Sequence, residues 1–152
     1  MHYDIYTDGA CSGNPGAGGY AFYIIPESKL EPILSYGGKA KTTNNQMELM
    51  AIVKALKHVA RSKHRVTDVT LYSDSAYCVN SIVNEYVNFW AANGWKTKQG
   101  KEVKNRELWE TYVEIRKTFP MLKVKFVKVK GHSGNKYNEL VDKAAKKAIP
   151  KE

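Results

Sequence analysis

The sequence predicts an α/β fold in which helices flank a five-stranded mixed sheet. Three strand-like segments come first and are joined by short Gly/Pro-rich turns, which favours an antiparallel meander of strands one to three. A long amphipathic segment then precedes a fourth strand and can cross the sheet, which makes strand four parallel to strand one. Later helical segments surround a fifth strand, so strands one, four and five are expected to be parallel.

The strands are indicated by short apolar runs bounded by turn residues. The run YAFYII, for example, is aromatic and β-branched and stops at Pro26. We expect strands over Tyr3–Thr7, Gly19–Ile25, Ile33–Ala40, Val69–Ser73 and Val124–Val129.

The helices are indicated by apolar residues at intervals of three and four. Thr43 or Asn44 can cap the first helix, and Asn105 is expected to cap the fourth, on which Trp109 faces the core. We expect helices over Thr43–Arg61, Ser75–Val83, Tyr86–Ala92, Arg106–Lys117 and Lys136–Ala148.

Composition limits the class of protein. An apolar content of 43% and a charged content of 26% are ordinary for a soluble globular chain, and no apolar run approaches the ~18–20 residues of a membrane span. No signal peptide is apparent at the N-terminus. Cys11 and Cys78 are too few for a disulfide framework or a metal cluster, so we expect reduced thiols, with a Cys11–Cys78 bridge as the alternative. We therefore expect a single cytoplasmic, monomeric domain over residues 1–152.

The net charge of +9 is concentrated in two segments. Residues 96–106 carry four lysines and one arginine against a single glutamate. The second segment, residues 123–136, contains Lys123, Lys125, Lys128, Lys130 and Lys136. Clustered lysine beside aromatic residues is typical of proteins that bind a phosphate backbone, although a solvated basic surface that binds nothing specific has the same composition.

The stretch TDGACSGNPGAGGY places Asp8 just ahead of a loop that contains five glycines. Residues 16–21 fit the dinucleotide pattern G-x-G-x-x-A, but that pattern requires a following helix and here a strand follows. The cofactor interpretation is therefore rejected. We interpret the glycines as a hairpin connection that lets backbone approach backbone or a ligand.

Several carboxylates are expected to meet at one sheet edge. Asp8 and Asp74 end two strands predicted to be parallel neighbours, and ligands of α/β sheets bind at that edge. Glu48 lies near the start of the crossover helix at a height the sequence leaves open, and Asp142 lies in the closing helix. Each acid alone is more typical of a turn, a cap or an exposed charge. Together they repel one another, which either raises their pKa values or requires a cation. Oxygen ligands favour Mg²⁺ or Mn²⁺, two of which form a clamp for phosphodiester displacement.

Four motifs carry a family resemblance: TDGACSGNPGAGGY with Asp8, TTNNQMELMA with Glu48, LYSDSAYCVNSI with Asp74, and VKGHSGNKYNELVDKAA with His132 and Asp142. In their order and spacing the chain resembles type 1 ribonuclease H, the bacterial single-domain form, over essentially its whole length. The resemblance implies Mg²⁺-dependent endonucleolytic cleavage of the RNA strand of RNA–DNA hybrids, leaving 3′-hydroxyl and 5′-phosphate ends, and a role in removing RNA primers and R-loops.

The resemblance also implies residue roles. Asp8, Glu48, Asp74 and Asp142 match the family's metal-binding acids, which hold two Mg²⁺ ions with Mn²⁺ as the alternative, and His132 matches a histidine that aids proton transfer or product departure. The segment at about 86–106 looks like the family's basic protrusion, here called the handle. The candidate substrate-binding residues are Asn14, Thr43, Asn44, Asn45, Ser75, Tyr86, Trp90, Lys96, Lys98 and Lys101.

Two other functions share the fold: a catalytically idle nucleic-acid-binding module, and a nuclease that acts on DNA junctions or ends. All four acids are present, which argues against the first, and the asparagines and the lysine-rich handle favour a hybrid substrate over DNA alone. Ala76, Phe89 and Ala91–Ala92 depart from residues often found in bacterial relatives. These departures bear on hybrid affinity and handle contacts rather than on the chemistry.

Overall fold

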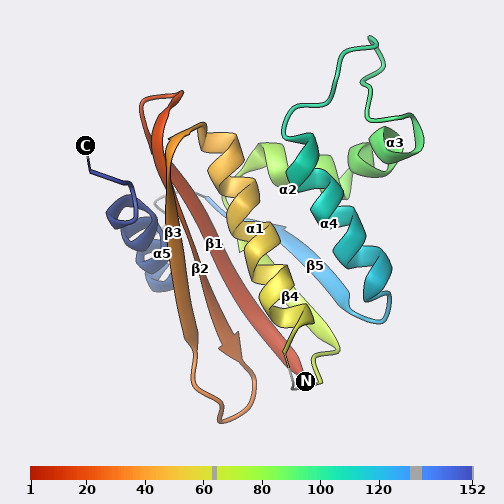
Figure 1. The fold of residues 1–152 in the computed structure, drawn as a ribbon. Coiled ribbons are helices and arrows are strands. Elements are labelled where there is room, and N and C mark those ends of the chain that lie inside the picture. The colour runs from red at the N-terminus through yellow and green to blue at the C-terminus, as the bar shows by residue number, and fades with distance from the viewer. Residues whose placement is uncertain (63–64, 131–134, 152) are drawn as a thin grey trace.

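A five-stranded mixed sheet forms the centre of the protein in a computed structural model that describes residues 1–62, 65–130 and 135–151. The strand order is β3-β2-β1-β4-β5 (Figure 1). Strands β1, β2 and β3 are antiparallel neighbours, and β1, β4 and β5 are parallel, which confirms the predicted sheet. The strands are β1 (His2–Ser12), β2 (Gly16–Pro26), β3 (Ile33–Thr42), β4 (Asp68–Ser73) and β5 (Lys123–Lys128).

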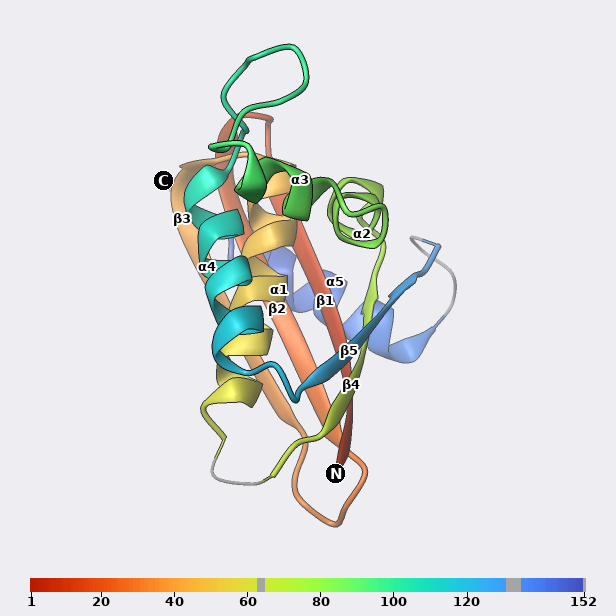
Figure 2. The same cartoon turned by 90° about the vertical axis from the view of Figure 1, so that its right-hand side faces the viewer.

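The helices cover both faces of this sheet. Helix α1 packs on β1 and β2 with α4 beside it, and α5 packs on β1 and β2 from the opposite face (Figures 1 and 2). The bounds lie within one residue of those predicted. They are α1 (Asn44–Ala60), α2 (Ala76–Val83), α3 (Tyr86–Ala92), α4 (Arg106–Thr118) and α5 (Lys136–Lys147). Among the described residues, no helix is both long enough and apolar enough to cross a membrane.

Side chains along each strand point alternately to the two faces of the sheet, and this divides the core in two. Ile5 and Phe22 point to the α1 face and join the main cluster, in which Trp109 is fully buried as predicted. Their neighbours Tyr6 and Ala21 point to the other face, where a smaller cluster packs beneath α5. Because successive strand side chains face opposite ways, each strand anchors helices on both sides of the sheet.

The order of the first three strands determines where α1 begins. An antiparallel meander of three strands returns the chain to the edge at which β1 ends. Helix α1 starts there, capped by Thr43, whose Oγ1 accepts a hydrogen bond from the Gln46 backbone N–H at 3.2 Å. Glu48, in the second turn, therefore lies at the same end of the strands as Asp8 and Asp74. The sequence had left this position of Glu48 along the sheet open.

The predicted hairpin connection is confirmed, but it is shorter than the glycine-rich stretch indicates. Strand β1 runs on to Ser12, Gly16–Gly19 belong to β2, and only residues 13–15 turn the chain. A Cβ at Gly19 would overlap the carbonyl oxygen of Ala145 in α5. Glycine is therefore needed at this position for close packing inside a strand. This confirms the predicted approach of backbone to backbone, although Gly19 lies outside the connection itself.

The predicted cap of α4 is confirmed in its position but not in its hydrogen bond. Asn105 occupies the N-cap position in the left-handed region, with φ of 62°, and its side chain makes no capping hydrogen bond. Instead, its Nδ2 donates to the Tyr77 hydroxyl at 3.2 Å. The side chain thus joins α4 to α2, and this contact competes with capping.

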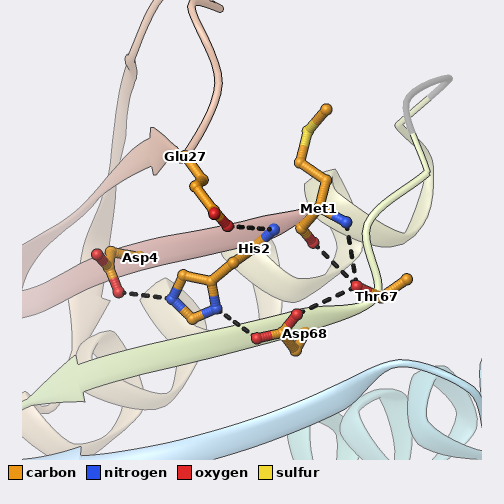
Figure 3. A network of polar contacts seen from close by, with 6 residues as sticks. All are labelled: Met1, His2, Asp4, Glu27, Thr67 and Asp68. Atoms are coloured by element: carbon orange, nitrogen blue, oxygen red, sulfur yellow. Dashed lines mark hydrogen bonds and ion pairs between the residues drawn. The ribbon is translucent and has the colours of Figure 1, made fainter.

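At the sheet edge remote from Asp8 and Asp74, a polar network fastens β1 to β4 (Figure 3). His2 lies between two carboxylates, with Nδ1 at 2.5 Å from Asp68 Oδ2 and Nε2 at 3.0 Å from Asp4 Oδ1. The hydrogen bonds with Asp68 and then Asp4 raise the pKa of His2. The Met1 amine donates to the Thr67 hydroxyl at 3.1 Å, so the chain's first residue is held in the same network.

Substituting Gly19→Ala is expected to destabilise the protein by about 1–3 kcal/mol, because the new methyl group meets the backbone of α5 rather than a mobile side chain. Gly37→Ala in β3 is the matched control, since its Cβ would meet the end of the Tyr20 side chain, which can rotate away. Urea unfolding of both variants measures the difference. Equal stabilities would contradict the account of how α5 packs on β2.

Candidate functional site

Three carboxylates converge at the edge where β1, β4 and the start of α1 meet. Asp8 comes from β1, Glu48 from α1, and Asp74 from the residue after β4. One carboxylate oxygen from each lies within 4.8 Å of the other two. Asp8 and Glu48 are each only 7% exposed, while Asp74 is half-buried. These residues are referred to below as the acidic triad.

The ends of the strands explain this placement. Parallel pairing between β1 and β4 stops at Tyr6 and Tyr72, so Asp8 lies just past the point where the sheet opens. After β4 ends, Ser75 caps α2 by accepting a hydrogen bond from the Cys78 N–H at 3.1 Å. Asp74 lies between the strand end and this cap and is thereby fixed at the opening.

The backbone of Gly9 holds two of the acids together. Its N–H points at both Asp8 Oδ1, at 2.8 Å, and Glu48 Oε1, at 2.5 Å. A Cβ at Gly9 would overlap the backbone of Met47 and Glu48. Glycine at this position therefore permits the close approach of α1 to β1 that brings the Glu48 carboxylate to Asp8.

Crowding and burial disfavour negative charge in the triad. Burial raises the pKa of Asp8 to about 6, with the charge of Asp74 acting in the same direction. Burial, and next the hydrogen bond with Asp8, raises the pKa of Glu48 well above its ordinary value. Glu48 Oε2 is buried without a hydrogen-bond partner among the described residues. An unpartnered buried oxygen within a set of carboxylates fits a hard divalent cation.

The triad lies in an open cleft of about 540 Å³. The cleft is also lined by the predicted substrate-binding residues Asn44, Asn45 and Ser75, and by Asp142 of α5. Asp142 lies outside the group of mutually close carboxylates, and its Oδ2 accepts a hydrogen bond from Lys146 Nζ at 3.0 Å. The structure thus gathers all four predicted acids in one cleft, but only three within ligand distance of one another.

The remaining predicted residues near the cleft have distinct positions. The side chain of Asn14, in the turn after β1, accepts a hydrogen bond from the Asn44 backbone N–H at 3.1 Å. This contact ties the turn to the first residue of α1, beside the cap Thr43. His132 falls outside the described residues.

The handle is anchored by aromatic residues and carries its lysines outward. Tyr86 is 50% exposed and stacks on Trp90, whose ring packs edge-on against Trp109. Trp95 and Val103 are buried and join the loop between α3 and α4 to the main core. That loop projects beyond the helices in Figure 2. The exposed predicted lysines lie on it: Lys96, Lys98 and Lys101.

Sequence reasoning missed three residues of this region. The shared Gly9 N–H could not be foreseen, because it depends on where α1 docks. Tyr77 lines the cleft, and its hydroxyl accepts from Trp109 Nε1 at 2.9 Å, a contact between distant segments. Lys146 follows Asp142 by four residues in a helix. That spacing predicts an ion pair between the two side chains and could have been used.

Substituting Asp8→Asn is expected to stabilise the metal-free protein above about pH 7 by roughly 3 kcal/mol. The pKa of Asp8 rises from 3.8 to about 6 on folding, so charging this group destabilises the fold progressively as pH rises through that interval. The difference between variant and wild type should disappear below the lower value. Urea unfolding across pH measures it, with exposed Glu31→Gln as control. A pH-independent difference would contradict the account.

Comparisons with known proteins identify the family of this chain. The RNase H family profile matches residues 1–150. Ribonuclease H of Acetivibrio thermocellus is 45% identical over 147 residues, covering 97% of this chain and 94% of the relative. Ribonuclease H of Wolbachia from Drosophila simulans is 46% identical over 145 residues, covering 95% and 93%. The crystal structure of LC11-RNase H1 in complex with an RNA/DNA hybrid has a TM-score of 0.73 and 25% identity, covering 97% and 96%. The chain therefore belongs to the RNase H family, whose enzymes hydrolyse RNA in RNA–DNA hybrids.

Proposed function

We propose that this chain cleaves the RNA strand of RNA–DNA hybrids endonucleolytically by two-metal-ion catalysis, giving 3′-hydroxyl and 5′-phosphate ends. The observation that carries the proposal is the acidic triad, in which three carboxylates lie within 4.8 Å and Glu48 Oε2 has no partner among the described residues. Mg²⁺ fits this all-oxygen set, with Mn²⁺ as the alternative. Asp8, Glu48, Asp74 and Asp142 would hold the ions.

Bound ions would supply the charge that activates a water molecule and stabilises the leaving 3′-oxygen. The protein's part is positioning. Gly9 fixes the Asp8 and Glu48 carboxylates, and the strand end fixes Asp74. Asp142 reaches the cleft from α5 and accepts a hydrogen bond from Lys146 of the same helix. His132 is proposed to assist proton transfer or product departure, in keeping with the titration range of an imidazole.

The substrate would be recognised by polar groups in and around the cleft. Asn44, Asn45 and Ser75 line it and offer groups that can donate to or accept from a 2′-hydroxyl. The side-chain oxygen of Asn14, Oδ1, already accepts a hydrogen bond from the Asn44 backbone N–H. The side-chain N–H₂ of Asn14 is therefore the group proposed to donate to RNA. Thr43, at a helix N-terminus, is proposed to contact a DNA phosphate.

The handle is proposed to grip the hybrid outside the cleft. Tyr86 and Trp90 would pack against deoxyribose, and Lys96, Lys98 and Lys101 would pair with backbone phosphates. With this activity the chain would remove RNA primers and R-loops as a monomeric, single-domain cytoplasmic enzyme. Both cysteines are free, which is compatible with a reducing compartment.

The direct test is cleavage of one labelled RNA strand presented alone, in an RNA duplex and in an RNA–DNA hybrid, beside a DNA duplex. Each substrate is incubated with Mg²⁺ and with chelator. Metal-dependent cutting of the hybrid alone is expected. Cutting of DNA would instead favour a DNA nuclease, and tight hybrid binding without cutting would favour a binding module.

Substituting Asp74→Asn is expected to lower kcat by roughly a hundredfold or more, because a ligand that contributes several kcal/mol to transition-state stabilisation is lost. Hybrid affinity measured in chelator should change less than about threefold, equivalent to under 1 kcal/mol. Glu114→Gln, which removes an exposed acid on α4, is the control. Normal turnover by the Asp74 variant would remove this residue from the site.

Substituting both Lys98→Gln and Lys101→Gln is expected to weaken hybrid binding and to reduce the slope of log K against log salt by about 2, because two phosphate contacts are lost. The matched control replaces Lys29 and Lys54, which are exposed and lie outside the handle. Binding is measured by fluorescence anisotropy over a range of salt. An equal slope in both double variants would argue against the role proposed for the handle.

A further inference from the structure

A second group of lysines lies outside the handle and reaches the cleft only at Lys130. Strand β5 and the residues just after it carry Lys123, Lys125, Lys128 and Lys130, here called the β5 lysine row. All four residues are exposed. Within the described part of the chain, none of them forms an ion pair with a carboxylate. The row is therefore uncompensated positive charge, which is attractive to a polyanion.

The row follows an edge strand of the sheet, whose outer side pairs with no other described strand. Strand β5 is the last in the strand order, and it pairs on one side with β4. The backbone N–H groups of Lys123 and Val129, near its two ends, both donate toward that side, to Thr67 and Ser73. Lys130 lines the catalytic cleft, whereas Lys123 lies beside Asp68 at the opposite end of the strands. The lysines thus follow β5 from the cleft to the far end of the strand, with Lys123 and Lys125 on one face and Lys128, by alternation, on the other. Figure 2 shows the course of β5.

The acids beside the Lys123 end of this row are already engaged. Pairing between β4 and β5 places Asp68 beside Lys123, and Asp4 follows one strand further in. Both carboxylates contact the His2 ring, at 2.5 Å and 3.0 Å (Figure 3). Because these contacts raise the pKa of His2, they favour its positive form, which offsets the acids. The lysines are left free to attract another anion.

We propose that the β5 lysine row binds the phosphates of a single-stranded nucleic-acid segment continuous with the hybrid in the cleft. The inference rests on the proposed function and adds a second contact surface to it. Lys123 and Lys125 lie on the same side of β5, about 6.6 Å apart along the strand. That interval suits successive phosphates of an extended strand, and a track of positive charge is how proteins follow single strands.

Edge lysines also have a structural use, because they discourage pairing with the edge of another sheet. This explanation makes a different prediction. Neutralising the lysines would then promote self-association and leave nucleic-acid binding unchanged. Sedimentation of the variant, run beside the binding measurement, distinguishes the two roles.

The experiment compares a blunt hybrid with the same hybrid bearing a short single-stranded extension at each of its four strand ends in turn. Binding is measured by fluorescence anisotropy in chelator, over a range of salt. The wild type is expected to bind at least one extended hybrid more tightly than the blunt one, with a salt slope steeper by about 1.4 for two single-strand contacts. The double variant Lys123→Gln with Lys125→Gln should lose that advantage and keep its affinity for the blunt hybrid. The double replacement of Lys29 and Lys54 is the control.

The outcomes separate this inference from the proposed function. If the wild type cleaves the blunt hybrid but no extension tightens binding, or if the double variant keeps the advantage, the inference is overturned alone. Unchanged binding together with self-association would assign the lysines to edge protection. If the wild type neither binds nor cleaves the blunt hybrid, the proposed function fails and the inference fails with it.

Discussion

The site depends on one close approach, between the backbone of β1 at Gly9 and the first turns of α1. A side chain at Gly9 would push α1 away from the sheet, and Glu48 would move with it. The same residue supplies the N–H toward which Asp8 and Glu48 converge. Two buried carboxylates repel each other when both are charged. The packing of backbone against backbone at Gly9 holds Asp8 and Glu48 together in spite of that repulsion.

The surrounding architecture maintains that approach. The three-strand meander delivers α1 to the correct edge, and the Thr43 cap fixes where its first turn starts. Trp109 and its neighbours pack α4 against the same side of the sheet. At the far end of their pairing, His2 links β1, which carries Asp8, to β4, which leads to Asp74. The site is consequently a product of the whole sheet rather than of a loop.

Much of this arrangement could be predicted from the sequence, because periodicity reports local structure faithfully. Pro26 ended a strand as expected, and the ends of five helices were located within a residue. What could not be predicted depends on contacts between distant segments. Gly19 looks like part of a loop until α5 is seen packed on it, and the Asn105 side chain looks like a cap until its hydrogen bond to Tyr77 is seen. The height of Glu48 and the separation of Asp142 from the triad are likewise tertiary properties.

The chain positions of the four acids have a consequence for biosynthesis. The triad is encoded within the first half of the chain, whereas Asp142 arrives with the last helix. Helix α5 packs against β1 and β2, the strands made earliest, so its docking is a long-range closing step. A ribosome-bound chain that has not yet released α5 would present an incomplete cleft. The fourth acid of the cleft is therefore in place only once α5 has docked on strands that were synthesised more than a hundred residues earlier.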